Sequence, residues 1–179
     1  MTFNALLENV AARAEEHERR ALAAVEGLSS EQFNRPAGME WSVARVFKHL
    51  CLADEPYLNA IEPAIAAAAP GDGEVKHTLF GKLLMKVSGP GGNAPAPGFL
   101  IPPDLPLSLE VVEEWRGHQQ RLVRLAEVAK GKNLSYRVRN PFIKFLRMSI
   151  ADIFGVVHVH NERHVQQIEE RCRSAKSVS

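Results

Sequence analysis

Four stretches of the chain carry apolar side chains at spacings of three and four residues, and this periodicity restricts the fold more than any other feature. Charged side chains fill the positions between, as in amphipathic helices that each bury one stripe. Helices of roughly 20–27 residues are about 30–40 Å long and can cover one another's stripes. The sequence therefore predicts an all-α fold, a four-helix bundle, forming a single domain over residues 1–179. The predicted helices span residues 2–27, 42–69, 108–129 and 149–173.

Serines at three helix starts can accept a hydrogen bond from an unpaired backbone N–H and so act as N-caps. They are Ser42, Ser108 and Ser149. Ser149 and Asp152 together have the spacing of a capping box. Pro56 and Pro63 lie inside the second stretch, where each removes one backbone hydrogen bond and crowds the preceding turn. We therefore expect a kink near residues 52–56, or two helices that meet there.

The connection between the second and third helices, residues 70–107, is too long for a simple turn. Within residues 88–107, ten of the 20 positions are Gly or Pro, so regular structure is not expected there. One short helix fits residues 77–87. We predict a long, irregular crossover connection whose residues 88–107 pack over one end of the domain and border the functional site as a lid. Residues 136–138 carry the one hint of a strand.

The charge balance, 22 Lys and Arg against 21 Asp and Glu, gives a formal net charge of +1. Nucleic-acid binding favours a positive excess, so we expect no nucleic-acid partner. No apolar stretch approaches the roughly 18 residues of a membrane span, and polar residues occupy the N-terminus, where a signal peptide needs an apolar run. The two cysteines, Cys51 and Cys172, form no disulfide framework, so we expect a cytoplasmic protein without a membrane partner.

Two histidines of the last predicted helix lie inside its apolar sector. With about 100° between successive residues and Val157 as the reference, His164 lies about 20° and His160 about 60° away. They are an i, i+4 pair, so their Cβ atoms lie about 5–6 Å apart and both rings can reach one ion. His158 falls at the margin of the sector and is a poor third ligand. On the second helix, His49 lies on the inner edge of the buried stripe.

Three imidazoles from two helices, those of His49, His160 and His164, can hold a divalent metal with open coordination positions, as in catalytic rather than structural zinc sites. Neutral imidazole also binds nickel, iron and copper. The alternative is that all three are buried histidines hydrogen-bonded to their neighbours. His17 and His118 continue the buried stripes of the first and third helices. Three roles stay open for each: a fourth ligand, a group that orients a ligand, or a core residue.

The segment from His160 to His164 differs from the metalloprotease helix motif, which needs Glu directly after the first His. Asn161 has that position here, and Glu162 points away from the core, which disfavours Glu162 as a general base. A basic run without acids precedes the last helix, and it either holds carboxylates of a ligand or forms a solvated surface. It consists of Arg137, Arg139, Lys144 and Arg147.

Three segments of the chain resemble the DinB-like superfamily. They are WSVARVFKHL at residues 41–50, RNPF at 139–142 and HNERHVQQI at 160–168. Members of this superfamily are four-helix bundles with a crossover connection, often homodimers. They hold a metal with one histidine on the second helix and two on the last. The resemblance therefore implies a divalent ion, zinc or nickel, on His49, His160 and His164.

The resemblance also implies a range of activities. Members include S-transferases that use bacillithiol or mycothiol, a mycothiol-dependent isomerase and metal-binding domains of ergothioneine-pathway enzymes. A divalent ion in an open site lowers the pKa of a bound water or thiol and makes the anion available near pH 7. We therefore expect a metal-dependent thiol S-transferase or hydrolase acting on a small electrophile, with a low-molecular-weight thiol in the first case and with catalytic residues unassigned. The alternatives are a non-catalytic metal or small-ligand binding module and a structural interaction domain.

Overall fold

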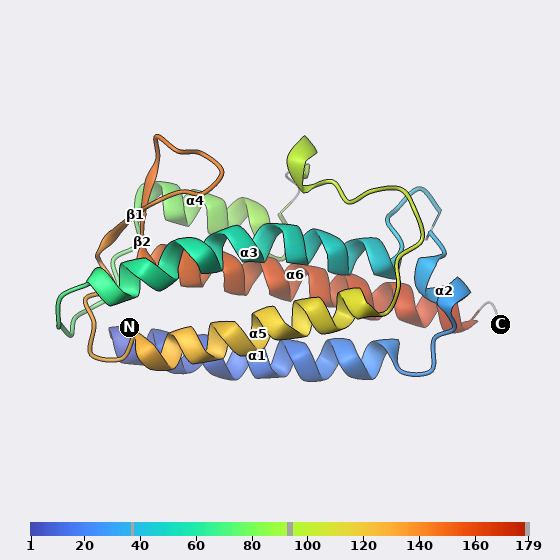
Figure 1. The fold of residues 1–179 in the computed structure, drawn as a ribbon, viewed down its shortest axis with the longest axis horizontal. Coiled ribbons are helices and arrows are strands. Elements are labelled where there is room, and N and C mark those ends of the chain that lie inside the picture. The colour runs from blue at the N-terminus through green and yellow to red at the C-terminus, as the bar shows by residue number, and fades with distance from the viewer. Residues whose placement is uncertain (37, 93–94, 178–179) are drawn as a thin grey trace.

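Four long helices lie side by side along the longest axis of the molecule (Figure 1). The structure, a computed structural model, describes residues 1–36, 38–92 and 95–177. Both α1 and α3 pack against α5 and α6, so the apolar stripes of all four helices are buried between them. The described chain is mostly helical, as predicted, with one small sheet in addition. The long helices are α1 (Phe3–Val25), α3 (Val43–Ala67), α5 (Glu110–Val128) and α6 (Ile150–Ser177).

The first helix, α1, begins and ends close to the predicted bounds. Thr2 is its N-cap, and the Oγ1 atom of Thr2 accepts a hydrogen bond from the backbone N–H of Ala5 at 3.2 Å. Beyond its end, Gly27 has a φ of +76°, a conformation that glycine adopts without strain. The chain leaves the helix there.

A short helix that was not predicted, α2 (Ser30–Asn34), follows α1. Ser29 and Gln32 form a capping box at its start, so the serine followed three residues later by glutamine was a usable signal. Its one apolar anchor is Phe33, which is fully buried and packs against Phe47 of α3 with 6.2 Å between ring centroids.

The predicted cap and the predicted interruption of α3 have different outcomes. Ser42 is the N-cap, and its hydroxyl accepts a hydrogen bond from the N–H of Arg45 at 3.3 Å, as expected. Pro56 and Pro63 both lie inside one continuous helix, so the expectation of two helices meeting there is wrong. Each missing N–H costs one hydrogen bond, but the buried stripe on both sides of the prolines packs against α5 and α6 and keeps the helix together.

The crossover connection contains the predicted short helix, α4 (Leu79–Ser88), capped by Thr78. A 3-10 turn, η1 (Gly98–Leu100), is the regular element in the described part of residues 89–107. α4 packs against α6, and η1 contacts α3 (Figure 1). Residues 93–94 of the predicted lid, like residues 178–179 of the predicted domain, lie outside the described residues.

A two-stranded antiparallel sheet precedes α6, formed by β1 (Arg137–Arg139) and β2 (Arg147–Ser149). The predicted strand at residues 136–138 thus lies one residue further along the chain and has a partner. The four basic residues of this hairpin are exposed, which agrees with a solvated surface. α5 begins two residues later than predicted, with Leu109 as its N-cap, although the hydroxyl of Ser108 accepts from the N–H of Glu110 at 3.3 Å.

The start of α6 has the predicted capping box. The N–H of Ser149 donates to Oδ2 of Asp152 at 2.9 Å, and the N–H of Asp152 donates to Oγ of Ser149 at 3.0 Å. The helix is longer than predicted and continues to Ser177. No helix in the described chain combines the length and the apolar character needed to cross a membrane.

The buried apolar side chains form two clusters, one toward each end of the long helices. One contains Leu58 and Phe154, and the other contains Phe47 and Ile168. Between them, every long helix contributes a buried polar side chain, so a polar layer crosses the helices at mid-length. These side chains are His17 of α1, His49 and Asp54 of α3, Gln119 of α5, and Asn161 and His164 of α6.

Candidate metal centre

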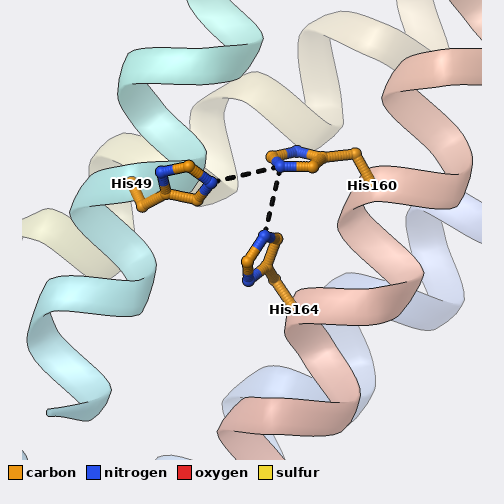
Figure 2. Close-up of side chains that lie close together, drawn as sticks. All are labelled: His49, His160 and His164. Atoms are coloured by element: carbon orange, nitrogen blue, oxygen red, sulfur yellow. Dashed lines mark hydrogen bonds between the residues drawn. The ribbon is translucent and has the colours of Figure 1, made fainter. Parts of the chain in front are cut away.

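His49 of α3 and His160 and His164 of α6 point their rings at one another within this layer (Figure 2). The Nε2 atoms of His49 and His160 are 3.2 Å apart, although 111 positions separate them in the sequence. The Nε2 atoms of His164 and His160 are 3.1 Å apart. One potential ligand atom from each of the three rings lies within 4.8 Å of the others. The structure therefore brings together the three residues that the sequence singled out.

Two of the three rings have their other nitrogen held in place. Nδ1 of His49 donates to the backbone oxygen of Leu100 at 2.8 Å, and Nδ1 of His164 donates to Oε1 of Gln167 at 2.8 Å. These oxygens only accept, so the ring proton sits on Nδ1 in both cases. Each Nε2 is then unprotonated and directs its lone pair toward His160, and a metal ligand of this kind is oriented by the bond on its far side.

The spacing of the nitrogens fits a divalent ion. Ligand nitrogens about 2.0–2.1 Å from a tetrahedral zinc ion lie about 3.3 Å from one another. The observed separations of 3.1 Å and 3.2 Å are close to that value. No fourth histidine, cysteine or carboxylate among the described residues joins the cluster, so an ion held there keeps at least one position open.

Burial keeps the three rings neutral. Loss of hydration on burial lowers the pKa of His49, and the positive charge of Arg163 lowers it further against the hydrogen bond to Leu100. The pKa of His160 falls to about 3, because of burial first and then the charges of His49 and Arg163. Burial lowers the pKa of His164 well below its ordinary value, and repulsion from His160 and His49 lowers it further against the hydrogen bond to Gln167. Protons therefore compete weakly for these nitrogens at neutral pH.

A cavity of about 520 Å³ adjoins the three rings. Its wall includes a group of aromatic rings: Phe99 stacks on Phe142 with 5.3 Å between centroids, and Tyr57 packs edge-on against Phe142 at 5.2 Å. Trp41 lies beside His49 with 5.1 Å between ring centroids. The polar side chains that line the cavity besides the histidines are those of Glu40, Asp54, Ser88, Asn140, Arg163, Gln167 and Arg171.

The described part of the predicted lid borders this cavity. Residues 95–97 and 99–100 line it, and the backbone oxygen of Leu100 holds the ring of His49. These residues therefore border the cavity, and their role as a lid over a functional site stays a prediction. Their position explains the composition of the segment, since a chain rich in Gly and Pro can follow the surface of two helices without forming its own hydrogen-bonded structure.

His17 and His158 lie on the other side of α6, outside the three-histidine cluster. Their rings stack with 5.5 Å between centroids, and Nε2 of His17 is 3.0 Å from Oε2 of Glu162. Glu162 also accepts hydrogen bonds from Arg20, and it takes no part in the cluster. Burial alone would raise the pKa of Glu162, but hydrogen bonds from Arg20, Gln166 and His17 outweigh burial and lower it to about 2. His17 is thus a core residue and neither a ligand nor a partner of one.

The remaining two histidines also stay apart from the cluster. His118 is partly buried on α5, and its Nδ1 has no hydrogen-bond partner among the described residues. His77 precedes α4, and its Nδ1 lies 2.9 Å from Oδ1 of Asp152. Asp152 also accepts from the backbone N–H and the hydroxyl of Thr78, so this carboxylate joins the N-terminal ends of α4 and α6.

A buried hydrogen-bond network next to His160 was missed by the sequence analysis. Asn161 donates to both carboxylate oxygens of Asp54 at 3.0 Å and accepts from Nε1 of Trp115 at 2.8 Å and from Nε2 of Gln119 at 3.0 Å. A signal existed, because Asn161 lies about 40° from Val157 on the helical wheel, inside the apolar sector. A polar residue in such a sector must find partners, and this one connects α3, α5 and α6.

One protein-family model matches most of the chain. The model of the DinB superfamily matches residues 13–168, a span that includes His49, His160 and His164. The chain belongs to the DinB superfamily. Neither the curated proteins nor the solved structures include a significant match to it. The resemblance seen in three short segments is thus confirmed over most of this DinB-superfamily chain.

Proposed function

We propose that this DinB-superfamily protein binds one divalent metal ion, zinc or nickel, through Nε2 of His49, His160 and His164. One observation carries the proposal: three neutral imidazoles from two helices converge at the spacing of metal ligands. Two of them are held by a hydrogen bond at the opposite nitrogen. Satisfied core histidines would have their nitrogens hydrogen-bonded to separate partners rather than directed at one point.

The metal centre is proposed to be catalytic, in a thiol S-transferase or a hydrolase that acts on a small electrophile. A bound divalent ion would lower the pKa of a thiol or a water and supply the nucleophile near pH 7. The chain itself contributes the cavity of about 520 Å³, which accommodates a small molecule beside the rings. The stacked rings of Phe99 and Phe142 offer an apolar surface to that molecule and exclude water.

A non-catalytic metal or ligand-binding module is the competing interpretation. The open side of the cluster and the adjoining cavity favour an enzyme, because a purely structural ion is usually enclosed by four protein ligands. A purely structural role for the three histidines is less favoured, since burying three rings around one point without an ion gains little packing.

We also propose that residues 1–179 form one domain, a four-helix bundle with a long crossover connection between α3 and α5. The reciprocal packing of α1 and α3 against α5 and α6 supports it. From the superfamily resemblance we further propose a homodimer that works in the cytoplasm. The near-neutral charge favours a small-molecule substrate over nucleic acid. Light scattering of the purified protein tests the dimer directly.

Elemental analysis after extensive dialysis tests the metal. About one zinc or nickel ion per chain is expected, with reloading of stripped protein by either ion. Less than a tenth of an ion per chain in both cases would exclude the site. A panel of electrophiles, assayed with several low-molecular-weight thiols and with none, then separates the activities. Product only with thiol indicates a transferase, product in water alone indicates a hydrolase, and no turnover with a fully loaded protein indicates a binding module.

A further inference from the structure

Arg163 has an unbalanced charge in the wall of the cavity. It lies on α6 between His160 and His164 and lines the same cavity. Its one hydrogen bond among the described residues goes to the backbone oxygen of Val87, in the last turn of α4, at 3.4 Å. No carboxylate in the described chain forms an ion pair with it. The guanidinium carries five N–H donors, so most of its capacity is unused.

The other charged groups of the cavity already have partners. Arg171 donates to Glu40 at 3.1 Å, and Asp54 is held by Asn161. Arg163 therefore provides a positive charge that has no ion-pair partner in the described cavity wall.

A divalent ion on the three histidines would add to this positive charge. Three neutral imidazoles would not offset the charge of the ion, and the guanidinium of Arg163 would lie beside it. A partly desolvated site of this kind binds anions in preference to neutral molecules. Guanidinium also matches the planar geometry of a carboxylate, to which it makes strong charge-assisted hydrogen bonds.

We propose that Arg163 forms an anion subsite beside the three-histidine cluster and binds a carboxylate of the small substrate or co-substrate. This inference rests on the proposed function and narrows its ligand class: the molecule carries a donor for the metal and a carboxylate a few bonds away. The weak contact with Val87 holds the guanidinium against α4 without occupying it. An incoming carboxylate replaces water rather than another carboxylate.

A matched pair of thiols tests the subsite by binding rather than by turnover. Protein loaded with cobalt(II) is titrated with 3-mercaptopropionate and with 3-mercaptopropionamide, and the thiolate-to-cobalt absorption band reports each Kd. The wild type is expected to bind the acid about tenfold more tightly than the amide. Arg163→Gln is expected to reduce that ratio to about one and to leave the affinity for the amide within about twofold.

Two further variants keep the result interpretable. Arg163→Lys keeps the positive charge and is expected to keep part of the preference, which a merely structural role would not predict. Arg173→Gln changes an exposed arginine of the same helix and is expected to keep the full ratio. An unchanged ratio in Arg163→Gln would overturn the proposal, since the carboxylate would then bind the metal or another group.

Metal-free protein separates this proposal from the metal site. The probe is 3-phenylpropionate, compared with 3-phenylpropionamide, and amide chemical shifts report binding. The acid is expected to bind more tightly than the amide in the wild type and equally in Arg163→Gln. If cobalt fails to bind while this preference holds, the metal function is wrong and the anion subsite stands. If cobalt binds, but Arg163→Gln leaves the preference for acid over amide unchanged with both probes, the subsite is wrong and the metal function stands.

Discussion

Asn161 donates its side-chain amide to both carboxylate oxygens of Asp54, at 3.0 Å each, across the contact between α6 and α3. Both residues are fully buried in the polar layer, and Asp54 also lines the cavity beside the histidines. The position of Asn161, directly after His160, links the orientation of a site residue to the packing of three helices. Stability and site geometry therefore depend on the same hydrogen bonds.

The carboxyl group of Asp54 is predicted to make folding stability depend on pH. Burial raises its pKa to about 7 from 3.8, and the hydrogen bond from Asn161 offsets only part of this. The folded state thus holds the proton more tightly than the unfolded state. The resulting stability is fully present below the unfolded pKa and is lost as the pH rises through about 7.

Asp54→Asn removes this titration and keeps an oxygen that can accept from Asn161. Between pH 5 and pH 8, the variant is expected to gain on the order of 3 kcal/mol relative to the wild type. Urea unfolding of both proteins at the two pH values measures the difference. A stability difference that is the same at both pH values would show that Asp54 does not titrate in this range.

Asn161→Ala is predicted to destabilise the fold by about 3 kcal/mol or more. The substitution leaves the indole N–H of Trp115, the amide of Gln119 and the carboxylate of Asp54 buried without their partner. Thermal or urea unfolding measures the loss. Asn59→Ala, at an exposed position of α3, is the control and should cost less than about 1 kcal/mol. Similar losses in the two variants would argue against a shared buried network.

His160→Ala is predicted to weaken zinc binding by about 100-fold or more while the helical circular dichroism stays close to that of the wild type. The same result is expected for His49→Ala and His164→Ala, because two imidazoles hold an ion far less tightly than three. Competition with a chromophoric chelator measures each Kd. His118→Ala, outside the cluster, should bind zinc like the wild type. Retention of full affinity in any of the three site variants removes that residue from the ligand set.

Gly81 of α4 is predicted to be required for the docking of that helix on α6. A Cβ atom at this position would lie 2.8 Å from Oδ2 of Asp152 and even closer to its carboxylate carbon, and Asp152 is the group that joins the two helix starts. Gly81→Ala is therefore expected to destabilise the protein by about 1–3 kcal/mol, measured by thermal unfolding.

Gly117→Ala is the matched control for this overlap. Gly117 lies on the exposed face of α5, and a Cβ atom added there would meet open space, with no described neighbour within 4 Å. Alanine should therefore stabilise this helix by about 0.5–1 kcal/mol. Opposite signs for the two substitutions are the expected result. Equal stabilisation would mean that α4 can move away from Asp152 without loss.

Features local to each segment of the sequence were enough to predict the long helices and the candidate metal ligands. Apolar periodicity is a property of each helix alone, so it located α1, α3, α5 and α6 within a few residues and put His49, His160 and His164 on inward faces. Caps are equally local, and Ser42 and the pair of Ser149 and Asp152 act as expected. The prolines of α3 were misleading because packing on both sides outweighs the loss of two backbone hydrogen bonds.

The placement of helix against helix depends on contacts between residues far apart in the chain, and periodicity carries no record of them. Which inward histidines meet was therefore settled by packing: His49 reaches His160 across 111 positions, whereas His17 stacks on His158 behind α6. The same holds for Asp54 and Asn161. Burying either polar side chain would be unfavourable without the hydrogen bond that the other provides. A helical wheel gives the direction of a side chain, and the neighbouring helix decides what that side chain encounters.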